Sequence, residues 1–154
     1  MENLVLVPFD GSPAAVEALR SACGSARLDA GAVVSLYVAK VPRNFPLSAQ
    51  LPWLAQEAER LRVLSDQIAR EERATVWPEW VCARDAARGI VDVAEELNVK
   101  QIVLGVERGS RFLVSLTPWS ALARVMMTAP CPVVLRSLPI ADAARTTMTP
   151  RVAI

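Results

Sequence analysis

Short apolar runs recur along the chain and predict five β-strands. The first run, residues 4–7, is wholly apolar, which is typical of a central parallel strand covered on both faces. The other runs are rich in β-forming residues and are bounded by turn-forming residues. They predict strands at residues 32–39, 74–82, 102–104 and 133–136.

Between these runs, apolar residues recur at helical spacing. Ser12 followed by Pro13 is typical of a helix N-cap and first helical position, and Asp85 can cap the third helix. Strands that alternate with helices predict right-handed crossovers and a parallel sheet with helices on both faces. The apolar positions predict helices at residues 13–27, 52–73, 85–98 and 120–127.

The third strand is predicted to lie at an edge of the sheet. Pro78 falls inside this strand, and proline has no N–H to donate to a hydrogen-bond ladder. Trp77 and Trp80 flank the proline closely. We interpret these two side chains as cover for the exposed sheet edge.

Composition narrows the class of protein. The chain has 154 residues, which suits one domain, and 53% of them are hydrophobic, which favours elements buried on both faces. The formal net charge of +1 argues against nucleic acid as a partner. No apolar run reaches the ~20 residues of a membrane span, and the first residues lack a signal-peptide pattern. We therefore expect a cytoplasmic protein without membrane contact.

The sequence contains no histidine at all. This removes histidine-based acid–base catalysis, histidine metal ligation and any Ser-His-Asp triad. Cys23, Cys82 and Cys131 are far apart and form no CxxC pair, so neither a zinc site nor a disulfide framework is indicated. We expect all three thiols to be reduced and buried.

A loop bounded by two glycines follows the fourth strand, with the sequence Gly105-Val-Glu-Arg-Gly109. Such glycines let backbone N–H groups approach an anion, or they form a tight exit from the strand. Ligands of parallel α/β folds bind beyond the carboxyl ends of the strands, so Asp10 and Gly105 are predicted to face one crevice. Asp10 can serve that site or simply form a turn before Gly11.

Three segments together resemble the universal stress protein family. Residues 7–19 are similar to its opening, which is valine, proline, any residue, aspartate, glycine, serine and an alanine-rich helix. Residues 102–105 and 129–136 resemble its fourth and final strands, and the likeness spans about residues 3–136. The resemblance implies an adenine nucleotide alpha hydrolase-like α/β fold whose five parallel strands have the order 3-2-1-4-5.

The resemblance also implies a crevice for ATP or AMP and a homodimer formed through the final strand. Asp10 and Val38 match the positions that hold the adenine in the family. Gly105, Gly109 and Ser120 match the positions that surround the ribose and phosphates. Serine at the start of a helix is also a common N-cap, so Ser120 has two interpretations.

The phosphate motif departs from the family pattern, which is glycine, two residues, glycine, nine residues, glycine, then serine or threonine. Three residues separate Gly105 from Gly109, and Trp119 stands in place of the third glycine. An indole there can stack on the ligand or plug the pocket. Glu107 adds a negative charge near the expected phosphates, and Arg108 and Arg111 can offset that charge.

Two functions remain compatible with these residues. The first is a non-catalytic stress-response signalling dimer that binds adenine nucleotide through an altered phosphate motif. The second is an interaction or structural module of the same fold that has lost nucleotide binding. An enzyme is not expected, because HxGH, SGGxDS and Walker-type motifs are absent. We expect the domain to cover residues 1–137 and residues 138–154 to form a mobile tail.

Overall fold

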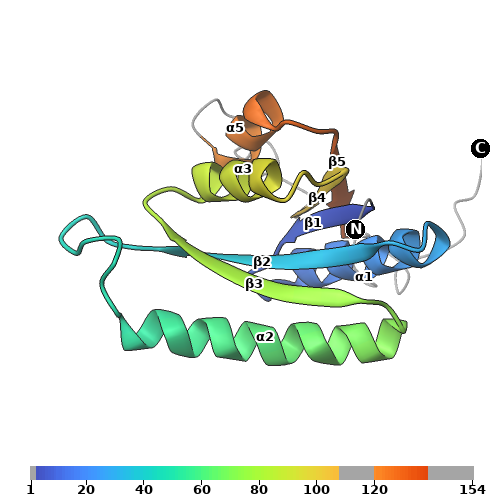
Figure 1. The fold of residues 1–154 in the computed structure, drawn as a ribbon, viewed down its shortest axis with the longest axis horizontal. Helices are drawn as coiled ribbons and strands as arrows, with labels where there is room; N and C mark the ends of the chain where they lie inside the picture. The colour runs from blue at the N-terminus through green and yellow to red at the C-terminus, as the bar shows by residue number, and fades with distance from the viewer. Residues whose placement is uncertain (1–2, 108–119, 139–154) are drawn as a thin grey trace, which may run out of the picture.

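The computed structural model describes residues 3–107 and 120–138. The described strands form one sheet of five, in which each neighbouring pair is parallel and the order is β3-β2-β1-β4-β5 (Figure 1). This confirms the predicted strand order. The strands are β1 (Leu4–Pro8), β2 (Ala32–Lys40), β3 (Val76–Ala83), β4 (Gln101–Val106) and β5 (Val133–Ser137).

Helices cover both faces of the sheet, as predicted. Figure 1 shows α3 and α5 on one side of the strands and α1 and α2 on the other. Each predicted helix is found within two residues of its expected bounds. The helices are α1 (Pro13–Leu28), α2 (Pro52–Glu72), α3 (Ala86–Glu96) and α5 (Ala121–Thr128).

Pro78 lies in an edge strand, because β3 has β2 as its single neighbour in the sheet. The N–H groups of Val33 and Val41 donate to the carbonyls of Thr75 and Ala83, at 2.9 Å each. Backbone groups alternate along a strand, so the odd-numbered residues of β3 face β2 and the even-numbered ones face outward. The nitrogen of Pro78 therefore points away from the sheet, where no ladder hydrogen bond is lost.

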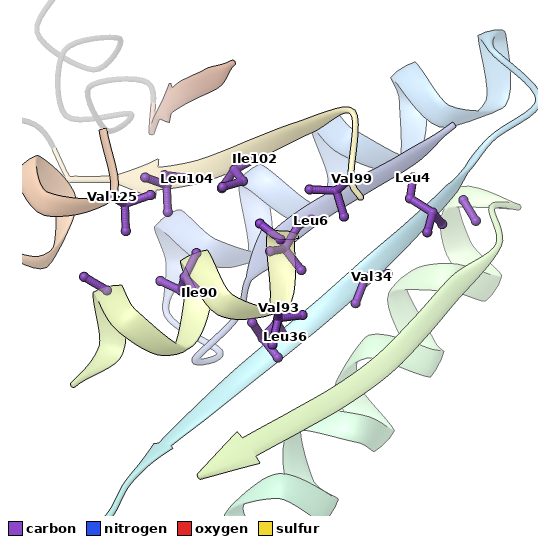
Figure 2. Close-up of a cluster of buried hydrophobic side chains, with 13 residues drawn as sticks. Leu4, Leu6, Val34, Leu36, Ile90, Val93, Val99, Ile102, Leu104 and Val125 are labelled. Atoms are coloured by element: carbon purple, nitrogen blue, oxygen red, sulfur yellow. The ribbon is translucent and has the colours of Figure 1, made fainter. Parts of the chain in front are cut away.

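Apolar side chains pack in two layers, one on each face of the sheet. In Figure 2, Ile90 and Val93 of α3 point toward the strands and meet Leu6, Leu36 and Ile102. On the opposite face, side chains of α1 and α2 pack against alternate residues of the same strands. Burial of a large aliphatic side chain stabilises a fold by about 1.5–3 kcal/mol, so these layers supply the main driving force for folding.

Two predicted N-caps have different outcomes. The Ser12 hydroxyl accepts a hydrogen bond from the N–H of Ala15 at 3.2 Å, which confirms the cap of α1. Asp85 stands at the N-cap position of α3, but its side chain makes no capping hydrogen bond there. Its carboxylate accepts a hydrogen bond from Arg124 instead, so the prediction that Asp85 caps this helix is wrong. The charged partner holds the carboxylate away from the helix backbone.

The cysteines are free, as predicted, but they are not all buried. Cys23 is fully buried in α1, whereas Cys131 is half-buried and Cys82 is exposed. The prediction of a buried Cys82 is wrong because this residue lies on the edge strand, where a long loop and one end of α2 give only partial cover. Trp77 and Trp80 remain 40% and 45% exposed on the same strand. The described helices include none that is both long and apolar enough to cross a membrane.

Candidate adenine-nucleotide crevice

Two adjoining pockets lie beyond the carboxyl ends of β1, β2 and β4. Their volumes are about 210 Å³ and about 340 Å³. Because they share wall residues, they form two halves of one crevice. The shared residues are Asp10, Ser12, Ile90, Leu104 and Gly105.

The smaller half brings together three residues that sequence analysis singled out. Asp10, Val38 and Gly105 all line this pocket, although they come from separate parts of the chain. Parallel strands end at the same edge of a sheet, which is why the tertiary structure unites them. The remaining wall is mostly apolar and includes Leu36, Ala86 and Ile90. A flat, carbon-rich ring is the kind of group that such a wall accommodates.

Asp10 is held by its own turn. The Oδ1 atom of Asp10 accepts a hydrogen bond from the N–H of Ser12 at 2.9 Å, and the side chain is exposed. Gly11 has φ of 77°, in the left-handed region that glycine adopts without strain. A Cβ at Gly11 would also lie 2.9 Å from Leu61 Cδ2. The turn interpretation of Asp10 is thus confirmed, and it leaves a carboxylate presented to the crevice.

Gly105 packs against the first turn of α1, and its position in the strand differs from the one predicted. It lies inside β4 rather than at the exit from the strand. A Cβ at this position would lie 2.2 Å from the carbonyl oxygen of Ala14 and 2.8 Å from the nitrogen of Ala15. The first turn of α1 therefore contacts the backbone of β4 directly. Glycine is required there by the helix, whether or not a ligand is bound.

Ser120 is the N-cap of α5. Its hydroxyl accepts a hydrogen bond from the N–H of Ala123 at 3.1 Å, which confirms the capping interpretation. The next residue, Ala121, lines the larger half of the crevice, so the N-terminus of α5 borders that half. Gly109 and Trp119 lie outside the described residues, and the structure does not place these two parts of the predicted phosphate motif.

The larger half combines favourable and unfavourable groups for an anion. Helix N-termini carry partial positive charge, and the N-terminal turns of α1 and α5 both border this half. Asp10 and Glu107 also line it, and they bring two carboxylates. Among the described residues that line it, none is lysine or arginine.

Gly89 lets α3 pack closely against Val38, which lines the smaller half of the crevice. A Cβ at Gly89 would lie 2.8 Å from Val38 Cγ1 and 3.3 Å from Ala83 Cβ. Sequence analysis did not single out Ala86, Ile90 or Leu122 as crevice residues. Ile90 belongs to the apolar pattern that predicts the third helix, but helical periodicity does not show which residues of a helix border a pocket.

Solved structures provide an independent comparison of this architecture. A universal stress protein from Archaeoglobus fulgidus in complex with dAMP aligns with a TM-score of 0.68 and 23% identity, covering 88% of this chain and 97% of that one. A universal stress protein in complex with cAMP aligns with a TM-score of 0.70 and 15% identity, covering 87% and 96%. Universal stress protein UspA from Lactobacillus plantarum aligns with a TM-score of 0.67 and 23% identity, covering 87% and 97%. A search of curated proteins found no match.

The strand order defines the class as a parallel α/β protein with the adenine nucleotide alpha hydrolase-like fold, and the crevice lies where the strand order reverses. The universal stress protein family model matches residues 1–135. The chain therefore belongs to the universal stress protein family. Among the described residues, no cluster of acidic residues, cysteine or histidine is arranged to hold a metal ion.

Proposed function

We propose that this chain is a non-catalytic stress-response signalling protein that binds adenine nucleotides mainly through their adenosine part. One observation carries the proposal. Asp10, Val38 and Gly105 line a single, largely apolar pocket, and this pocket opens into a half that holds two carboxylates. Among the residues that the structure describes, the adenine side of the crevice is therefore more complete than the phosphate side.

The smaller pocket suits adenosine for two physical reasons. Leu36, Val38 and Ile90 offer carbon surface to a planar base. The Asp10 carboxylate accepts hydrogen bonds from hydroxyl or amino groups, which adenosine carries. Two relatives of the same fold were solved with dAMP and with cAMP, and both ligands contain adenine and a single phosphate.

Additional phosphates on the nucleotide add little to its binding free energy in the larger pocket. Each one brings negative charge toward Asp10 and Glu107, and like charges repel most strongly where water is partly excluded. The helix N-termini offset part of this repulsion, typically by 0.3–1 kcal/mol each. We therefore expect ATP to bind no better than AMP.

Calorimetric titration with adenosine, AMP, ADP and ATP tests this proposal. We expect micromolar to millimolar affinities, roughly −8 to −4 kcal/mol, that differ by less than about threefold across the series. A tenfold gain from adenosine to ATP would show a working phosphate site and overturn the adenosine-based mode. No heat with any ligand at millimolar concentration would favour the second candidate, an interaction module that has lost nucleotide.

Variants in each half of the crevice test the contribution of that half to ligand binding. Asp10→Asn is expected to weaken adenosine most, because it removes a hydrogen-bond acceptor beside the adenosine. It should weaken ATP less, because the same change removes one of the two negative charges that the phosphates meet. Glu107→Gln removes one negative charge, whichever group pairs with that side chain, and is expected to tighten ATP but not adenosine. Glu95→Gln, on the exposed side of α3, is the matched control and should leave both affinities unchanged. Trp119→Gly restores the family glycine and tests whether the indole limits ATP binding.

The absence of catalysis is tested directly. Incubation of the protein with ATP and Mg²⁺, followed by a phosphate assay, should release no phosphate above that of a Asp10→Asn control. Turnover that depends on Asp10 would contradict a purely ligand-binding role.

We also propose a homodimer formed through the β5 edge. β5 ends the sheet beside β4, and Val134 on it is 42% exposed. Met126 and Met127, on the neighbouring α5, are exposed as well. An apolar edge strand is commonly paired or covered in a native protein. Sedimentation at high micromolar concentration should show a dimer that Val134→Lys dissociates, and a wild-type monomer would overturn the assignment.

A further inference from the structure

The opposite edge of the sheet offers a second place for recognition. Alternation along β3 directs the backbone N–H and C=O groups of Trp80 and Cys82 away from β2, toward the outer edge. Pro78 removes the donor two residues before Trp80, which limits outward pairing to the C-terminal half of the strand. This half ends at Ala83. The edge therefore presents a short row of backbone groups with a defined start and end.

An apolar pocket of about 420 Å³ adjoins this same stretch of the edge, far along the sheet from β5. Its walls come from the β2–α2 loop, the first turn of α2 and β3, and none of its described lining residues is charged. The volume is sufficient for one or two aliphatic side chains. The wall includes Ala49, Leu51, Leu54, Trp80 and Cys82.

The loop that forms the pocket has a small core of its own. Ala39, Val41, Leu51 and Leu54 are buried together there, and Phe45 packs edge-on against Trp53 with ring centroids 6.0 Å apart. Arg84, just after β3, donates to the carbonyl of Pro42 at 2.7 Å and secures the start of the loop. Figure 1 shows this loop extending past the end of α3, beyond the rest of the sheet. The loop that forms the pocket wall is therefore held in place by its own buried side chains and by the Arg84 hydrogen bond.

The two ends of this stretch of β3 differ in charge. Glu59 and Glu79 line a neighbouring pocket that also includes Trp80, whereas the C-terminal end of the edge is basic. Lys40 and Arg43 are exposed at the C-terminal end of β2 and in the loop, and Arg84 follows β3. Residues 41–56 contain no aspartate or glutamate. Register pairs Lys40 with Ala83, next to the pocket residue Cys82. An acidic group at this end of the edge would meet complementary charge.

We propose that the β3 edge binds an extended peptide segment, whose backbone pairs with Trp80 and Cys82 and whose apolar side chain enters the adjoining pocket. The peptide runs antiparallel to β3, since antiparallel pairing is slightly more stable per residue. Its acidic residues precede the apolar one and face Lys40, Arg43 and Arg84. Main-chain hydrogen bonds supply affinity, and the pocket and the basic rim supply selectivity.

Fluorescence anisotropy tests this assignment with a synthetic probe, acetyl-Glu-Asp-Thr-Thr-Leu-Thr-Val-Thr, whose C-terminal carboxyl group is joined to a fluorophore through an amide bond. We expect saturable binding at roughly 100 μM. A probe with two lysines in place of Glu-Asp should bind several-fold more weakly at low salt, and the difference should shrink as salt is added.

Two protein variants locate the site. Cys82→Pro removes an outward N–H without touching the ladder to β2, as Pro78 already does, and should weaken the probe about tenfold. Ala55→Phe places a ring in the pocket and should weaken it similarly, because Ala55 lines the pocket. The matched control is Val63→Phe, which adds the same ring at an exposed position of α2 outside the pocket wall. Circular dichroism confirms that each variant is folded.

Several results would overturn the proposal. One is the absence of probe binding at millimolar concentration, and another is equal binding by wild type, Cys82→Pro and Ala55→Phe. Attachment to phosphatidylglycerol vesicles without peptide binding would assign the patch to an anionic membrane surface. Self-association that Cys82→Pro abolishes, without peptide binding, would assign it to a second copy of this chain.

Discussion

The guanidinium of Arg124, on α5, donates a hydrogen bond to the carboxylate of Asp85, the residue that precedes α3. This pair connects two helices whose first residues, Ala86 and Ala121, line the two halves of the crevice. An arginine and an aspartate about 39 positions apart in sequence thus hold the crevice walls together.

Removal of either partner should loosen that connection. We expect Asp85→Ala and Arg124→Ala each to lower the free energy of unfolding by about 1 kcal/mol, a small effect because both side chains are partly exposed. The double variant should cost less than the sum of the two. Urea denaturation of all four proteins measures the coupling energy, and strict additivity would show that the pair contributes nothing.

Gly105→Ala tests the direct contact between β4 and α1. The added Cβ would meet backbone atoms of Ala14 and Ala15, which cannot move without displacing the helix. We expect a loss of stability of about 3 kcal/mol or a failure to fold. Gly24→Ala, within α1, meets only Arg27 at 3.9 Å and should stabilise the protein by up to about 1 kcal/mol. Thermal unfolding compares the two, and similar effects would contradict the packing role.

A buried hydrogen bond joins Ser35 on β2 to Ser65 on α2, with 2.6 Å between their hydroxyl oxygens. Ser65→Ala leaves the Ser35 hydroxyl buried without this partner and should cost about 1–3 kcal/mol. The double change to alanine removes both polar groups and should recover part of that loss. Chemical denaturation measures the free energy of unfolding of each variant. A loss in the double variant equal to the sum of the two single losses would contradict the pairing.

Cys23 should make stability depend on alkaline pH. Burial raises the pKa of its thiol to about 11, from 9.0 in the unfolded chain. The unfolded state then loses its proton first, so this contribution is complete below pH 9 and is lost as the pH rises toward 11. Urea midpoints at pH 8 and pH 10.5 measure the loss. Cys23→Ala should reduce the difference, whereas the exposed-site control Cys82→Ala should leave it unchanged.

Local sequence patterns were sufficient for most elements and for one half of the candidate site. Periodicity located the strands and helices, because buried and exposed positions repeat along the sequence with a period that differs between the two kinds of element. Pro78 identified the edge strand, since a missing N–H is tolerated only on an outward-facing backbone position. The motif at residues 7–12 identified the Asp10 turn, because serine caps and glycine turns are local interactions.

Other features depend on contacts between distant parts of the chain. The sequence predicts Asp85 as a helix cap, but Arg124 from another helix binds its carboxylate. The sequence predicts a buried thiol at Cys82, but its position at the sheet edge exposes it. Short sequence patterns do not identify such partners, because residues far apart in the sequence can lie side by side in an α/β fold.

Residue order alone is enough to predict the elements, the edge position of β3 and the family, since these follow from periodicity, turn chemistry and short motifs. The tertiary structure decided why Gly105 must be glycine, which walls surround Asp10 and Val38, and where carboxylates meet the N-termini of α1 and α5. These properties arise only when the carboxyl ends of parallel strands come together at one edge, which places residues nearly a hundred positions apart in the same crevice.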